Sequence, residues 1–60
     1  MNAVEIQTHA QKLFAAHGTK ALAEAAQKVR DLEQRGDKQQ AQDWKQIERA
    51  LQHMRGPNAS

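Results

Sequence analysis

The chain has 60 residues, no cysteine and a formal net charge of +2, with nine Lys and Arg set against seven Asp and Glu. This length allows one small domain, and the lack of cysteine excludes disulfides and zinc sites with thiolate ligands. Because a domain this short with few large apolar side chains is marginally stable alone, a partner subunit is expected.

The start of the chain carries no targeting signal that we recognise. Residues 1–5 contain no basic group, and Glu5 and Lys12 interrupt any apolar run, so we expect no signal peptide and a cytoplasmic protein. No uncharged apolar segment approaches the roughly 20 residues needed to span a bilayer, so no membrane partner is expected.

The first predicted helix covers about residues 3–17. Asn2 followed by Glu5 three positions later is typical of an N-cap with a capping box. Gly18 is expected to end the helix and Thr19 to cap the next one, so a two-residue link forces a sharp reversal. The residues predicted to share one side of this helix are Ile6, Ala10, Leu13, Phe14 and His17.

The second predicted helix covers about residues 20–35 and has the best-formed apolar stripe of the chain. The stripe consists of Leu22, Ala25, Ala26, Val29 and Leu32, at helical spacing. The alanines keep the helix surface low, so that a neighbouring helix can approach closely. We therefore expect this helix to be the central packing partner, with the Trp44 indole against it.

The third predicted helix covers about residues 38–55. Asp37 is its expected N-cap, with Gln40 reaching back to the backbone amide of Asp37, and Gly36 is expected to end the preceding helix in the left-handed conformation. Gly56, followed by a proline, is the expected C-terminal cap, and residues 56–60 are predicted to be a flexible tail. The apolar stripe of this third helix consists of Trp44, Ile47, Leu51 and Met54.

These elements predict an all-α fold in a single domain of residues 1–55. The second and third helices form a hairpin, and the first covers or extends it. We expect Trp44 to be the centre of the core, because it is the largest side chain in any stripe. The residues predicted to form the core, or to meet a partner, are Leu13, Phe14, Leu22, Val29, Leu32, Trp44, Ile47, Leu51 and Met54.

The pattern of His17-Gly18, spaced alanines, Leu32, Gly36-Asp37 and Trp44-x-x-Ile47 followed by Leu51 resembles a group of short, uncharacterised bacterial α-helical proteins. The resemblance covers most of the chain, and its elements are mostly folding signals. It implies a helical architecture and a bacterial cytoplasmic setting, and it implies no reaction.

Catalysis and metal binding find little support in the sequence. No two of the three histidines stand at the i, i+4 spacing of a metal-binding pair on one helix. His17 is expected to pack at the edge of the core, where an imidazolium would interact well with the dipole at the helix end. A small helical unit also lacks the volume for a substrate pocket, so we expect no enzyme, no cofactor and no small-molecule substrate.

The outer face of the third predicted helix carries more positive than negative charge, unlike the rest of the surface, where the two signs are mixed. It is predicted to present Lys38, Lys45, Arg49 and His53, with Gln42 and Gln46 between them. Such a face could lie along phosphates, although it also fits an ordinary solvated surface. With about four cations, binding to nucleic acid would be weak and sensitive to salt.

The sequence therefore favours a small non-catalytic protein-interaction module or accessory subunit. It would associate with itself or with a larger protein through apolar surface left over from its own core. The alternative is a small nucleic-acid-associated regulator that uses the basic face of the third helix.

Overall fold

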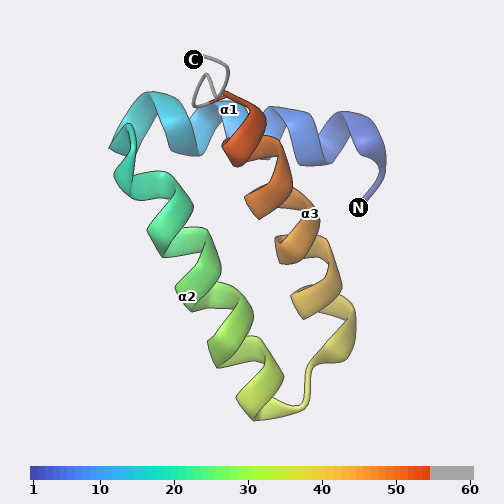
Figure 1. Ribbon diagram of the computed structural model, residues 1–60. Helices are drawn as coiled ribbons and strands as arrows, with labels where there is room; N and C mark the ends of the chain where they lie inside the picture. The colour runs from blue at the N-terminus through green and yellow to red at the C-terminus, as the bar shows by residue number, and fades with distance from the viewer. Residues whose placement is uncertain (55–60) are drawn as a thin grey trace.

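A computed structural model of the chain describes residues 1–54, which form three helices joined by two tight turns (Figure 1). Helix α1 spans Ala3–His17, α2 spans Lys20–Arg35 and α3 spans Lys38–Met54. Helices α2 and α3 form an antiparallel hairpin, and α1 lies across its open end (Figure 1). The predicted all-α fold is confirmed. The expected end of the third helix at Arg55, the Gly56 cap and the tail of residues 56–60 lie outside the described residues.

The core lies where the three helices meet, and Ile47 and Leu51 are its largest fully buried side chains. Four alanines are buried with them, which lets the helix backbones approach closely. Leu13, Phe14, Leu22 and Met54 are only partly buried and pack around this centre. The buried residues are Ile6, Ala10, Ala21, Ala25, Val29, Leu32, Ala41, Ile47 and Leu51.

The sequence led us to expect Trp44 at the centre of the core, and this expectation is wrong. Its side chain is partly buried and packs against the core from the edge. The reason is steric, because helices that approach each other over alanines such as Ala25 leave no room between them for an indole. Ile47, three residues further along α3, takes the central position instead.

The first turn of α1 is closed by the predicted capping box. The backbone amide of Glu5 donates to Oδ1 of Asn2 over 2.8 Å, and the backbone amide of Asn2 donates to Oε1 of Glu5 over 3.2 Å. Two amides that have no partner inside the helix are thereby satisfied.

The turn between α2 and α3 has the hydrogen bonds of a Schellman motif. Gly36 adopts the left-handed conformation, with φ 82° and ψ 12°, as predicted. Its amide donates to the carbonyl of Glu33 over 3.1 Å, and the Asp37 amide donates to the carbonyl of Leu32 over 2.9 Å. These two bonds satisfy carbonyls at the end of α2.

Asp37 caps α3, but Gln40 does not complete the capping box that we expected. The Gln40 amide donates to Oδ1 of Asp37 over 3.1 Å, and the Gln40 side chain donates to Oδ2 of the same carboxylate, also over 3.1 Å. Because the Asp37 amide is already bonded to Leu32, it is not free to pair with Gln40. Both bonds from Gln40 therefore converge on one carboxylate.

The expectation that Thr19 caps α2 with its side chain is wrong. Thr19 has helical backbone angles, φ −67° and ψ −17°, and its side chain makes no cap hydrogen bond. Gly18 has the non-helical angles instead, its amide donates to Phe14, and its carbonyl accepts from the Ala21 amide over 3.1 Å. One glycine thus ends α1 and opens α2.

Candidate interaction surfaces

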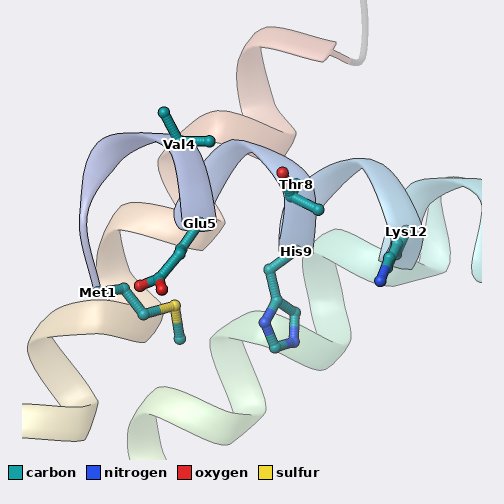
Figure 2. Close-up of a pocket in the computed structure, with 6 residues that line it drawn as sticks. All are labelled: Met1, Val4, Glu5, Thr8, His9 and Lys12. Atoms are coloured by element: carbon teal, nitrogen blue, oxygen red, sulfur yellow. The ribbon is translucent and has the colours of Figure 1, made fainter.

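An open groove of about 520 Å³ runs along one side of α1 (Figure 2). We call it the α1 groove, and it is lined by Met1, Val4, Glu5, Thr8, His9 and Lys12. All six residues belong to α1 or directly precede its N-cap. The groove was not predicted, because the stripe of α1 that we read from the sequence was the one facing the core.

The rim of the α1 groove carries the exposed apolar side chains of the molecule. Val4 is 74% exposed and Met1 is 46% exposed, and within residues 1–54 they are the two exposed large hydrophobic residues. Figure 2 shows Val4 at the upper edge of the helix, Thr8 on the face toward the viewer, and Glu5 and His9 pointing down from the lower edge. The groove therefore combines an apolar edge with polar and charged groups.

The two charged side chains of the groove, Glu5 and Lys12, have opposite signs and are both exposed, whereas the amino group of Met1 is paired with Asp43. Glu5 uses one carboxylate oxygen for the capping box, and its other oxygen makes no described hydrogen bond. Within the described part of the chain, neither Glu5 nor Lys12 takes part in a side-chain ion pair. Both charges are thus available to a partner that occupies the groove.

The inner wall of the groove is held in place by a contact between aromatic rings. The ring of His9 meets the ring of Trp44 edge to face, with centroids 5.2 Å apart and an angle of 69° between the planes. The Lys28 ammonium of α2 lies 5.9 Å from the centroid of the same indole. We did not predict a role for His9, although its position three residues after Ile6 and four before Leu13 places it beside the core-facing stripe.

Part of the predicted basic face of α3 lines two hollows of the surface. Gln42, Lys45, Gln46 and Arg49 line a hollow of about 300 Å³ on α3. Arg49 and His53 also line a groove of about 290 Å³ between α1 and α3, with Gln7 on its α1 side. Lys38, the fourth predicted cation, lines neither of these hollows.

The acidic residues of α3 stand at the flanks of this face. Oδ1 of Asp43 lies 3.2 Å from the amino group of Met1, and Glu48 is partly buried. Neither residue lines the two hollows that contain Arg49. Lys45 is less free, because its Nζ lies 3.1 Å from Oε2 of Glu33 on α2. Of the Lys and Arg side chains that line these hollows, Arg49 is therefore the one without an ion pair among the described residues.

His17 does not pack at the edge of the core as predicted. It is exposed, and its Nδ1 lies 3.4 Å from Oε2 of Glu24 on α2. Among residues 1–54, no group of three His, Asp or Glu side chains is placed to hold a metal ion. None of the described helices is both long enough and apolar enough to cross a membrane.

Comparisons of the chain with protein-family models, with curated proteins and with solved structures gave no match. What the chain does must therefore follow from its own surfaces. Two of these surfaces stand out in the described residues, namely the α1 groove and the basic face of α3. They differ in character, because the first has an apolar edge and charges of both signs, and the second has cations and amides.

Proposed function

We propose that this protein is a small non-catalytic interaction module that binds another protein chain, with no cofactor. The observation that carries the proposal is Val4, a β-branched apolar side chain that is 74% exposed on the edge of an open groove. Burying such a side chain against a partner removes apolar surface from water, which is the main favourable term in most protein association.

The position of α1 in the fold supports the same function. Helix α1 has two buried residues, Ile6 and Ala10. On the same side, the larger apolar side chains of Leu13 and Phe14 are only partly buried. The hairpin of α2 and α3 holds most of the core. The inner side of α1 therefore packs on the hairpin, and its outer side is available to a partner.

The proposal is tested by replacing Val4 with lysine and following association by sedimentation across concentrations. Because Val4 is exposed, Val4→Lys should leave the helical signal unchanged and reduce association with any partner that covers the groove. The matched control is Ala23→Lys, which adds the same charge at an exposed position of α2. Association that is equally strong in both variants and in the parent would place the interface elsewhere and overturn the proposal.

A second candidate function is binding of nucleic acid by the basic face of α3. The observation that favours it is the hollow formed by Gln42, Lys45, Gln46 and Arg49, whose lining includes no carboxylate. Arg49 is its unpaired cation among the described residues, since Lys45 pairs with Glu33 of α2. Lysine and arginine bind phosphates, and glutamine and arginine side chains can also reach base edges in a major groove.

Salt dependence separates this candidate from apolar association. Binding to a DNA duplex should weaken steeply with salt, with a log-log slope of about −0.9 per phosphate contacted, whereas burial of apolar groups is not screened. The double reversal Lys45→Glu with Arg49→Glu should abolish DNA binding. The control is Lys20→Glu with Arg30→Glu, which changes the net charge equally on α2. An equal loss in both variants would show attraction to overall charge and no site on α3.

A further inference from the structure

We propose that the partner seated in the α1 groove is a second copy of this chain, with the two α1 helices antiparallel about a two-fold axis. In this arrangement Glu5 of each copy faces Lys12 of the other. The inference rests on the proposed function, because it names the occupant of the same groove. The observation behind it is that the groove carries one acidic and one basic side chain, Glu5 and Lys12, so two antiparallel copies place opposite charges against each other.

The spacing of the two charges sets the register. Glu5 and Lys12 stand seven residues apart on α1, so they lie on the same side of the helix, separated by about 10.5 Å along its axis. Their midpoint falls between Thr8 and His9, which also line the groove. A two-fold axis through that midpoint brings each carboxylate opposite an ammonium group of the other copy, and both pairs form at once.

An antiparallel arrangement is the one that the charges favour. If two α1 helices packed parallel and in register, Glu5 would face Glu5 and Lys12 would face Lys12, and like charges in an interface disfavour association. Antiparallel helices also place the positive end of one helix dipole beside the negative end of the other. In this register Val4 lies at the flank of the contact, because it projects from a different edge of α1 than Glu5 does (Figure 2).

The small size of the surface makes this a weak and reversible dimer. A helix of 15 residues is about 22 Å long, so the area that two such helices bury is at the lower end of specific interfaces. Association should therefore be visible only at high protein concentration. Salt should weaken it, because exposed charges are screened by ions, but far less than the steep loss expected for binding along several phosphates.

The test uses two charge reversals, separately and mixed. Glu5→Lys alone gives a chain with lysine at both positions, and Lys12→Glu alone gives a chain with glutamate at both, so each should self-associate about tenfold more weakly or worse than the parent. An equimolar mixture should recover association close to that of the parent, because each lysine then faces a glutamate. Sedimentation equilibrium at low salt, over a concentration series, measures all three.

Several controls keep the result interpretable. Glu5→Lys also removes half of the capping box, so its helical signal and melting are measured first, and rescue by mixing cannot arise from a loss of folding. Arg30→Glu, which changes the net charge as Lys12→Glu does but lies on α2, should leave association unchanged.

The outcomes separate this inference from the proposed function. A dimer that is lost in Val4→Lys but unaffected by either reversal would keep the groove as the interface and overturn the register proposed here. A parent chain that stays monomeric at all concentrations would overturn the second copy as the occupant. The proposed function would fail separately if proteins retained by the immobilised parent chain were retained equally by Val4→Lys and by Ala23→Lys. If both variants keep the helical signal of the parent, failure of the mixture to recover association would also overturn the antiparallel pairing.

Discussion

The ring of His9 on α1 lies edge to face against the ring of Trp44 on α3, with 5.2 Å between the centroids. This contact joins the crossing helix to the hairpin at the inner wall of the α1 groove. Because the chain contains a single tryptophan, its fluorescence reports directly on this junction. The contact therefore ties the fold of α1 to a surface that we propose to be functional.

Replacing His9 by alanine should loosen the junction without unfolding the hairpin. Aromatic pairs contribute about 0.5–1.5 kcal/mol beyond the area that they bury, so His9→Ala should lower the free energy of unfolding by about 1 kcal/mol. Trp44 emission should shift to longer wavelength as water reaches the indole. Lys12→Ala, on the same helix, is the control and should change neither quantity. An unchanged emission spectrum in His9→Ala would mean that the rings do not meet in solution.

Ile47→Ala should lower the free energy of unfolding at least as much as Trp44→Ala, although isoleucine is the smaller side chain. Ile47 is fully buried at the centre of the core, and Ile→Ala substitutions at such sites cost about 2–5 kcal/mol. Trp44 stands at the edge, so Trp44→Ala should cost less than the roughly 3–5 kcal/mol typical of a buried tryptophan. Denaturation followed by circular dichroism measures both. A larger loss for Trp44→Ala than for Ile47→Ala would return the indole to the centre of the core.

The two turn glycines should respond differently to asparagine. Gly36 is left-handed with φ 82° and ψ 12°, and Gly36→Ala should cost about 1–2 kcal/mol from backbone strain alone, since a Cβ there meets no atom within 4 Å. Asparagine tolerates this conformation, so Gly36→Asn should recover part of the loss. Gly18 has φ 62° and ψ −137°, a region that essentially only glycine occupies, so Gly18→Asn should recover nothing relative to Gly18→Ala. Thermal melts of the four variants decide this, and equal behaviour at the two sites would contradict it.

The capping residues of α2 and α3 should also differ. Asp37 accepts two hydrogen bonds from Gln40, and loss of such a cap costs about 0.5–2 kcal/mol. Thr19 makes no cap hydrogen bond, so Thr19→Ala should change the free energy of unfolding by less than about 0.5 kcal/mol. The two alanine variants are compared by urea denaturation. A loss in Thr19→Ala as large as that in Asp37→Ala would show that the threonine hydroxyl caps α2 after all.

The starts of the helices and the turns between them could be read from the sequence because they depend on residues a few positions apart. The capping box of Asn2 and Glu5 and the left-handed Gly36 are local features of this kind. The Thr19 prediction failed even at this range, because Gly18 satisfies both helices and leaves the threonine inside the turn. A capping residue type therefore indicates a turn more reliably than it indicates which residue makes the bond.

Burial and the pairing of charges were decided only by the tertiary structure. The stripe of α3 does not reveal that Ile47 fills the centre and Trp44 the edge, because this depends on how closely alanines let the three helices approach. Nor does it reveal that Lys45 pairs with Glu33, because the two residues stand on different helices and meet only when the hairpin closes. The spacing of Glu5 and Lys12 was present in the sequence throughout, but only the structure shows that both side chains line one open groove and make no side-chain ion pair among the described residues. Local hydrogen bonds determine where a helix begins. The packing of the three helices determines which of its side chains are buried and which of its charges are paired.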